Sequence, residues 1–237
     1  MSKVTAIAMR ELKTYFVSPL AYVVAAIYML ITGFLFWVIM MSTKEASLRP
    51  LYQNMAVVAL FFLPAITMRL LAEERKTGTI ELLMTSPITD WAIVAGKYLS
   101  TVLYVVFLLA LTSAFPLAMV IIGGKPEWAP LLSGYLAVAL FFCALTAIGL
   151  MASSFTTNQI VAGTTALAIA LVIWLLPAAG GAFGPPLSDA FQYVSIISHL
   201  ENMSRGVIDS SDIIYYLSVI AVSLLITVRS VNIYHWR

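Results

Sequence analysis

Long stretches without a charged residue alternate with short polar segments along this chain. The charge-free stretches cover residues 14–43, 50–68, 98–124, 128–188 and 213–228. Because a helix needs about 20 apolar residues to cross a bilayer, the fourth stretch is too long for one crossing. It divides at the polar cluster 153–159. The pattern therefore predicts six membrane-spanning helices, at about 20–41, 51–70, 92–122, 130–152, 159–177 and 212–230.

Composition leads to the same class of protein. Hydrophobic residues make up 62% of the chain and charged residues 10%, with a mean hydropathy of +0.98, whereas a soluble domain carries about 25% charged residues. We expect an all-α polytopic membrane protein with one transmembrane domain over 1–237. The first apolar stretch exceeds the length of a signal-peptide core, so no cleavable signal peptide is expected. The formal charge of +2 mostly reflects the basic residues of the loops on one side of the membrane. It therefore gives no reason to expect a nucleic-acid partner.

Basic residues are unevenly divided between the two sides of the predicted membrane. With the amino terminus inside, nine of the 13 lie on the inner side and four on the outer side. This bias predicts that both termini and the segment 71–90 are cytoplasmic. The inner set is Lys3, Arg10, Lys13, Arg69, Arg75, Lys76, Lys97, Arg229 and Arg237, and the outer set is Lys44, Arg49, Lys125 and Arg205.

The residues before the first span have an amphipathic pattern. Apolar positions recur at helical spacing at Val4, Ile7, Ala8, Leu12, Tyr15 and Phe16, and Lys3, Arg10 and Lys13 fall on the other side. This predicts an interfacial helix along the inner membrane surface, with the chain entering the membrane at Ser18–Pro19. Glu11 interrupts the apolar stripe. A basic flank that only sets topology is the alternative.

The connection 178–211 on the outer side also contains a helical pattern. Glycines and prolines at 180–186 end the fifth span. One apolar face follows at Tyr193, Ile196, Leu200, Met203 and Val207, opposite polar Gln192, Ser195, Ser198, Asn202 and Arg205. An outer amphipathic helix is therefore predicted between spans five and six, which either returns into the bilayer surface or caps a pore from outside. An interfacial helix that only shields the bundle is the alternative.

The segment 71–90 concentrates charge between two long apolar stretches. Its charged side comprises Glu73, Glu74, Arg75, Lys76 and Glu81, and its apolar side Ile80, Leu82, Leu83 and Met84. The sequence Thr77-Gly78-Thr79 predicts a helix break, with Thr79 capping a short second helix that Pro87 ends. A short amphipathic helix suits a groove on another protein. A solvated loop that only fixes topology is the alternative.

Catalytic and metal-binding chemistry is sparse. Cys143 has no cysteine partner, and His199 and His235 lack partners at ligand spacing, so no metal site is expected. The middle of each predicted span has no ionisable residue, which argues against an ion-coupled carrier, and the two halves show no convincing repeat. An intramembrane enzyme is least favoured. Small residues at Ala162, Ala166 and Ala170 form either a dimer seam or a packing face within the subunit.

Four sequence blocks, in order, are similar to one known family. The block Glu-Glu-Arg-Lys-Thr-Gly-Thr-Ile-Glu-Leu-Leu-Met-Thr-Ser-Pro at 73–87 resembles the signature cytoplasmic loop of the type-2 class of ABC exporter permeases. The similarity continues at Gly96–Leu99, Ala152–Gln159 and Ser198–Asp209, and this order resembles the gliding-motility-type branch. Thr157 departs from the acidic residue of many relatives.

The resemblance implies a non-catalytic permease subunit in a prokaryotic cytoplasmic (inner) membrane. ATP and Mg would be bound by a separate cytoplasmic ABC ATPase dimer, in agreement with the lack of a phosphate-binding loop here. It also implies a second permease copy and an auxiliary membrane-anchored subunit with a large outer domain. A mechanical transmitter without cargo, or a passive channel or carrier, is the alternative. The ATPase would be docked by Glu73, Glu74, Arg75, Thr77, Gly78, Thr79, Glu81, Leu82, Leu83, Met84 and Pro87.

Overall fold

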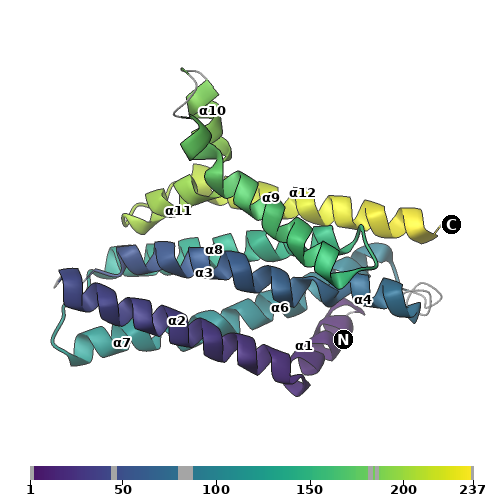
Figure 1. Ribbon diagram of the computed structural model, residues 1–237, viewed down its shortest axis with the longest axis horizontal. Helices are drawn as coiled ribbons and strands as arrows, with labels where there is room; N and C mark the ends of the chain where they lie inside the picture. The colour runs from purple at the N-terminus through teal and green to yellow at the C-terminus, as the bar shows by residue number, and fades with distance from the viewer. Residues whose placement is uncertain (1–2, 44–46, 80–87, 181–183, 185–186, 236–237) are drawn as a thin grey trace.

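The computed structural model describes residues 3–43, 47–79, 88–180, 184 and 187–235, which form a bundle of helices without strands in these ranges (Figure 1). The helices are α1 (Lys3–Val17), α2 (Pro19–Thr43), α3 (Arg49–Thr67), α4 (Arg69–Thr77), α6 (Asp90–Thr112), α7 (Ala114–Ile121), α8 (Trp128–Ser153), α9 (Gln159–Gly180), α10 (Leu187–Val194), α11 (Ile196–Ser204) and α12 (Ser210–His235). Both chain ends lie near α4, at what we name the α4 end of the bundle. The opposite end, where α11 lies, is the α11 end.

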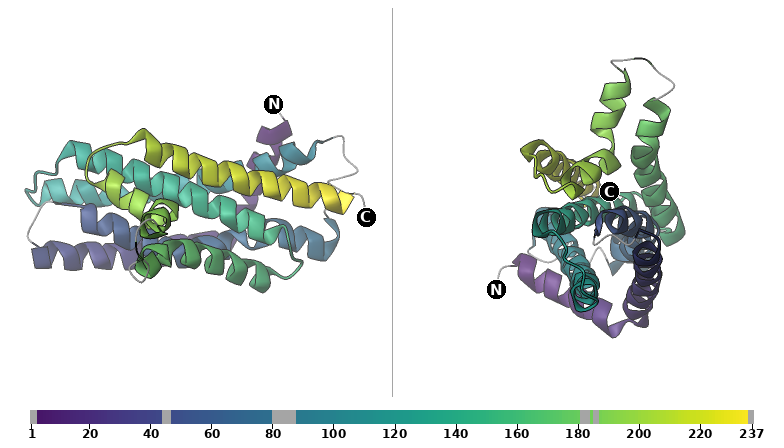
Figure 2. Two further views of the ribbon diagram at one scale, coloured as in Figure 1. Left: turned by 90° about the horizontal axis from the view of Figure 1, so that it is seen from above. Right: turned by 90° about the vertical axis from the view of Figure 1, so that its left-hand side faces the viewer.

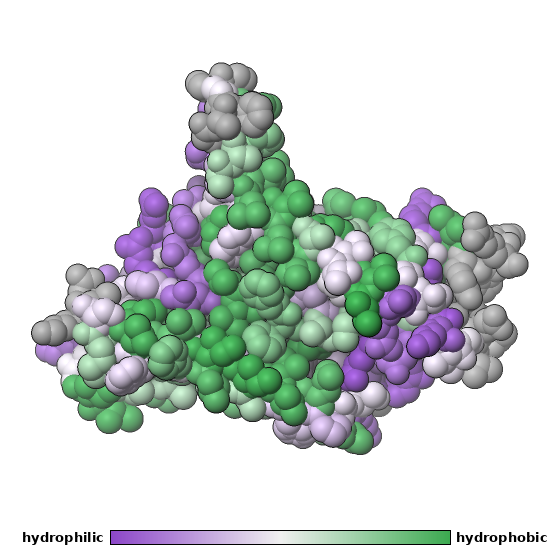
Figure 3. Space-filling view, viewed as in Figure 1, coloured by the Kyte–Doolittle hydropathy of each residue, from purple (hydrophilic) through white to green (hydrophobic). Residues whose placement is uncertain are grey.

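Six helical stretches in the described part of the chain are long and apolar enough to cross a membrane. They are Pro19–Ser42, Arg49–Thr77, Asp90–Ile121, Trp128–Ser153, Gln159–Gly180 and Ser210–Ile233. Figure 3 shows an apolar surface over the middle of the bundle and hydrophilic patches toward both ends. The predicted class, an all-α polytopic membrane protein with six spans, is confirmed. Which end faces the cytoplasm stays a prediction.

Helix α8 forms the centre of the bundle. It packs against α3, α6, α9, α11 and α12, and its residues Phe141 and Phe142 are fully buried. Its glycines allow α3 to approach closely, because a Cβ at Gly134 or Gly149 would overlap the side chains of α3. Small residues are the usual means by which membrane helices come this close, since lipid provides no hydrophobic force between them.

The third predicted span consists of two helices, α6 and α7, which meet at Ser113. Pro116 has no N–H group to donate to the carbonyl of Thr112, so the helical hydrogen bond is missing at this point. The hydroxyl of Tyr135 on α8 donates to that carbonyl instead, at 2.8 Å. The carbonyl freed at the break is therefore hydrogen-bonded by a residue of the central helix, and this bond also fixes the position of the break.

Helix α9 is the most exposed of the six spans and packs on the bundle through small residues. Ala162, Ala166 and Ala170 are buried, and α9 contacts α8 and α3. Of the two alternatives for this face, packing within the subunit is the one that the structure shows. Figures 1 and 2 show the far end of α9 pairing with α10 in a hairpin that projects from the bundle.

The outer amphipathic helix differs from its prediction in length. Instead of one helix through Tyr193–Val207, the chain forms α10 and α11, separated by Ser195 in an extended conformation (φ −74°, ψ 125°). The apolar face of α11 is buried as predicted, at Ile196, Leu200 and Met203. Val207 instead follows Gly206, whose positive φ of 95° has ended the helical turn, and is exposed.

Two tyrosines of α12 account for this break. The hydroxyl of Tyr215 donates to the carbonyl of Val194 at 2.5 Å, and that of Tyr216 donates to the carbonyl of Ile196 at 2.8 Å. These carbonyls flank Ser195, where a continuous helix would have used them internally. Side chains distant in sequence therefore override the local helical pattern.

Candidate functional site

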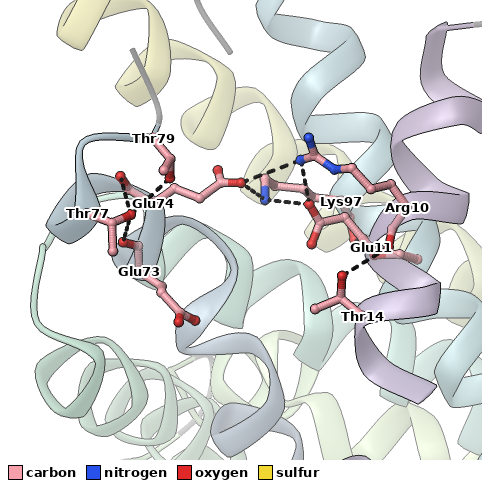
Figure 4. Close-up of polar contacts among 9 residues, drawn as sticks. Arg10, Glu11, Thr14, Glu73, Glu74, Thr77, Thr79 and Lys97 are labelled. Carbon is pink, nitrogen blue, oxygen red and sulfur yellow. Dashed lines mark hydrogen bonds and ion pairs between the residues drawn. The ribbon is translucent and has the colours of Figure 1, made fainter. Parts of the chain in front are cut away.

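An ionic cluster lies at the α4 end, where α1, α4 and α6 meet (Figure 4). The Nζ atom of Lys97 on α6 lies 2.8 Å from Oε1 of Glu74 on α4 and 3.2 Å from Oε1 of Glu11 on α1. Arg10 extends the cluster, with Nη2 3.0 Å from Glu11 Oε1 and 3.8 Å from Glu74 Oε1. The side chain of Lys97 is 1% exposed and each carboxylate 16%. Two cations and two carboxylates thus meet around a buried lysine, while the side chain of Arg10 is 57% exposed.

Helix α1 reaches this cluster by packing tightly on the start of α6. Ile7 is buried against it, and Gly96 allows the contact, because a Cβ on Gly96 would lie 2.8 Å from Ile7 Cβ and 3.1 Å from the Val4 carbonyl oxygen. The ring of Tyr15 stacks on Tyr104 with centroids 5.6 Å apart. The apolar stripe predicted for a membrane surface is thus covered largely by protein.

The other residues predicted for this helix point in different directions. Phe16 meets Phe107 of α6 edge-on at 5.2 Å, whereas Lys13 is exposed. The guanidinium of Arg69, at the start of α4, lies 5.4 Å from the ring centre of Tyr15, within the range of a cation–π contact. The predicted helix exists, and its placement along a membrane surface stays a prediction.

Glu11, which interrupts the stripe in the sequence, contributes the carboxylate of α1 to the cluster. Burial raises the pKa of Glu11, but the charges and hydrogen bonds of Lys97 and Arg10 outweigh it and hold that pKa below its usual value. The group is therefore ionised at neutral pH. Its stabilising effect is full above the ordinary carboxyl pKa and is lost as pH falls through the lowered value.

A cavity of about 400 Å³ adjoins the cluster, with walls from α1, α4 and α6. Glu74 shares this wall with Glu73 and Thr77. The buried Oε2 atom of Glu74 has no hydrogen-bond partner within the described part of the chain. Such an oxygen, next to a cavity, is suited to accept a hydrogen bond from water or from a partner molecule.

Helix α4 continues α3 beyond the apolar region and ends at Gly78. Gly78 has a left-handed conformation (φ 72°), which glycine adopts without strain and which closes a helix. The Thr77 hydroxyl donates to the Glu73 carbonyl at 2.9 Å and lies 2.9 Å from the Thr79 hydroxyl. The predicted break is confirmed. The rest of the predicted docking helix, including Glu81, Leu82, Leu83, Met84 and Pro87, lies outside the described residues.

The charged residues of α4 face two ways. Arg75 points inward, where its Nη2 donates to the carbonyl and hydroxyl oxygens of Ser230 on α12, at 3.3 and 3.2 Å. The Ser230 hydroxyl donates to the Ser154 carbonyl at the end of α8. Glu73 is exposed and points away from Lys97 (Figure 4). Of the residues predicted to dock, Glu74 and Arg75 are thus engaged within the subunit, and Glu73, Thr77, Gly78 and Thr79 are exposed.

A second buried charge pair, at the α11 end, was not foreseen from the sequence. His199 Nδ1 lies 2.6 Å from Asp212 Oδ1, and His199 Nε2 lies 2.8 Å from the Tyr193 carbonyl. Because a carbonyl only accepts, Nε2 donates to it, and Nδ1 is the ring nitrogen that meets the Asp212 carboxyl group. This pair joins α11 to α12, and the ring of Tyr215 stacks on the imidazole at 4.0 Å.

Sequence reasoning also missed the central role of Lys97. Because it lies at the start of a predicted span, the charge pattern identified it only as one of the nine basic residues on the inner side. The available signal was Glu11, an acidic residue on an apolar stripe, which requires a buried cation nearby. Nothing in the spacing of residues 11, 74 and 97 indicates that they meet.

The contact between α1 and α6 gives a direct prediction. Gly96→Ala places a methyl group against Ile7 and should destabilise the protein by about 1–3 kcal/mol. It should also make the bond after Lys13 more sensitive to trypsin. Gly33→Ala is the matched control, because its Cβ would meet Phe115 at an ordinary 3.7 Å. Equal melting temperatures and cleavage rates for the two variants would contradict the tight packing.

Comparison with known protein families gives a match over nearly the whole chain. The sequence profile of the family described as ABC-2 family transporter protein matches residues 5–233. The match runs from α1 to α12 and includes all three helices of the ionic cluster. No curated protein sequence matches the chain.

Proposed function

The chain belongs to the ABC-2 transporter family, and we propose that it couples ATP hydrolysis by a separate cytoplasmic ATPase to export across the membrane. Membership supports a permease subunit of an ABC transporter, a multi-pass membrane protein with an ABC ATPase as its partner. The observation that carries the coupling proposal is the set of side-chain bonds that hold α4 to its neighbouring helices. This helix carries the first predicted docking residues, ends directly before the short second helix predicted from Thr79, and is bonded directly to α1, α6 and α12 and through Ser230 to the end of α8.

Each bond on α4 leads to a different part of the bundle. Glu74 joins it through Lys97 to α6 and, through the shared cluster, to α1. Arg75 joins it through Ser230 to α12 and the end of α8. A displacement of the docking segment would therefore reach four helices at once. In our proposal, closure of the ATPase dimer on ATP binding supplies that displacement.

In this proposal the docking residues have different roles. Leu82, Leu83 and Met84 form the apolar contact in the ATPase groove. Glu73 and Glu81 pair with charges on the ATPase and set the register of docking more than its strength. Gly78 gives the turn that directs the segment away from α4. Glu74 and Arg75 act inside the subunit and hold α4 in place.

The proposed assembly places two copies of this chain on an ATPase dimer, with the α4 end in the cytoplasm of a prokaryotic cell. ATP and Mg belong to the ATPase, and this subunit is not catalytic. The small-residue face of α9 is buried within the subunit, so the contact between copies uses another surface. A heterodimer with a related permease satisfies the same geometry.

The resemblance to the gliding-motility-type branch favours a second candidate, transmission of movement across the membrane without cargo. That branch has an auxiliary membrane-anchored subunit with a large outer domain. Co-purification of such a subunit with this chain would support transmission. Uptake of a cargo into inverted vesicles, dependent on ATP, would support export.

We expect the tagged protein, purified gently from its native membranes, to bring down an ATPase at equal stoichiometry. Leu82→Asp should reduce that recovery at least tenfold, because it puts a charge in an apolar contact. Gly78→Val should keep the protein in the membrane but uncouple ATP hydrolysis from transport. Leu187→Asp is the matched control, at an exposed leucine of α10.

Two results would contradict the proposal. One is full recovery of the ATPase with Leu82→Asp, which would remove the docking assignment. The other is a wild-type preparation without an ATPase under several gentle conditions, which would remove the coupling role.

A further inference from the structure

Three basic residues, far apart in sequence, converge on one cavity at the α11 end. Arg49 begins α3, Lys125 lies between α7 and α8, and Arg205 follows α11. They line a cavity of about 390 Å³ together with Glu127. This volume falls in the range of small-molecule sites, about 300–1,000 Å³. They are also three of the four basic residues that the charge pattern assigned to the outer side.

These cations form no ion pair with a carboxylate within the described part of the chain. Their charged groups take part in none of the ion pairs or side-chain hydrogen bonds there, and Arg49 contributes only its backbone N–H, which donates to Ser47 Oγ. Glu127 is the single carboxylate among the lining residues. The cavity wall therefore carries an excess of positive charge. Like charges held together repel, and a bound anion would turn that repulsion into attraction.

The floor and walls of the cavity are fixed by packing. Leu48 and Tyr52 are buried beneath it, and the Tyr52 hydroxyl donates to the Leu131 carbonyl at 3.2 Å. Gly206, with a positive φ of 95°, lets the chain pass close to Pro130, where a Cβ would lie 3.1 Å from the proline ring. This contact ties the end of α11 to the start of α8 and holds Arg205 at the rim.

Helix α8 also begins at this cavity, where Glu127 leads into it. The first N–H groups of that helix and its dipole favour an anion at this position. The start of α3 adds only its dipole, because Arg49 N–H donates to Ser47 Oγ, Pro50 has no N–H, and the N–H groups of Leu51 and Tyr52 donate to the Leu48 carbonyl. Both helix starts add to the field of the three side chains, which supply the mobile donors. The three basic residues are exposed, so an anion would meet their donors at the rim, above the buried Leu48 and Tyr52.

We propose that this cavity binds a phosphate-bearing anion through Arg49, Lys125 and Arg205. Guanidinium groups bind phosphate oxygens in pairs, and a lysine adds a point charge. Two sources share this chemistry: the headgroup of an anionic lipid at this membrane face, and a soluble phosphate compound on the same side. The site does not depend on the proposed coupling to an ATPase.

The test uses the full-length protein and two probes. In one arm, native mass spectrometry counts phosphatidylglycerol retained from nanodiscs of phosphatidylglycerol and phosphatidylcholine. In the other, calorimetry measures binding of inorganic phosphate to protein in pure phosphatidylcholine nanodiscs. The double variant Arg49→Gln/Arg205→Gln should bind at least tenfold more weakly to whichever probe the wild-type protein binds. Arg229→Gln, an exposed arginine at the α4 end, should leave it unchanged.

Each outcome decides the proposal. Binding of phosphatidylglycerol that depends on the two arginines supports a lipid site, and arginine-dependent binding of phosphate supports a soluble ligand. Failure of both probes to bind the wild type overturns the site, as does equal binding by the double variant. Should the double variant not fold, Lys125→Gln on the exposed connection takes its place, with a weaker but measurable loss expected.

Discussion

Lys97→Met should lower the free energy of unfolding by about 3 kcal/mol and abolish ATP-driven activity of the assembled complex. The substitution keeps most of the side-chain volume and removes the charge. Glu11 and Glu74 would then face each other with Arg10 as the remaining cation of the cluster. Because both carboxylates are largely buried, their mutual repulsion is poorly screened by water. We expect α1 and α4 to separate from α6.

The test compares thermal unfolding in detergent with the ATPase rate after reconstitution. The decisive control is the triple variant Lys97→Met/Glu11→Gln/Glu74→Gln, in which Arg10, with a side chain 57% exposed, keeps the remaining charge of the cluster. Its melting temperature should recover most of the loss, since no buried charge is then left unpaired. A single Lys97→Met variant as stable and active as the wild type would show that the cluster is dispensable.

Gly149→Ala should also destabilise the protein by about 3 kcal/mol, through packing rather than charge. The new methyl group would overlap the Thr67 hydroxyl and lie 2.7 Å from the Thr67 Cβ. Thr67 is fully buried, so rotation of its side chain cannot clear the space. The central helix α8 and α3 must move apart, and the contacts along their length weaken together.

Thermal unfolding and the yield of monodisperse protein measure this effect. Gly184→Ala is the matched control, because a Cβ there meets nothing within 4 Å. Thr67→Ala in the Gly149→Ala background removes the overlapping hydroxyl and should restore part of the stability, which a pair of coupled neighbours requires. Additive losses in the double variant would mean that the two residues are not in contact.

The six spans were predictable because membrane crossing depends on composition over about 20 residues, which any one sequence displays directly. The helix break at Gly78 was predictable for a similar local reason, since glycine next to threonines favours a left-handed cap. The break at Ser195 depends instead on tyrosine hydroxyls of α12, and at the Ser113 break, which Pro116 causes, the freed carbonyl is bonded by a tyrosine of α8. Spacing along the chain contains no record of such contacts.

The candidate site was predictable only in part, for the same reason. The charged segment after the second span identified α4, but the pattern treated Glu74 and Arg75 as surface residues. Their partners, Lys97 and Ser230, lie 23 and 155 residues away. The pair of His199 and Asp212 shows the same limit. The sequence analysis considered His199 only for metal-ligand spacing, whereas its partner is the carboxyl group of Asp212 on the next helix.

The continuity of α3 and α4 has a mechanical consequence. Across their junction, the Met68 N–H donates to the Pro64 carbonyl at 2.9 Å, so Arg49–Thr77 acts as one rod. At 1.5 Å per residue the rod is about 43 Å long. It meets α8 closely at two points, Thr67 against Gly149 and Tyr52 against Gly134. Thr67 lies about 15 Å from the Thr77 end, and Tyr52 lies about 5 Å from the Arg49 end.

The rod is therefore fastened to the central helix near both of its ends. A push at the Thr77 end would move α3 and α8 together instead of tilting α3 alone. The wall that Arg49 contributes to the basic cavity would move with Pro130 and Leu131 of α8, so the cavity would keep its shape while the two helices shift. Transmission of this kind needs no change in the helices themselves, only the two close contacts that Gly149 and Gly134 permit.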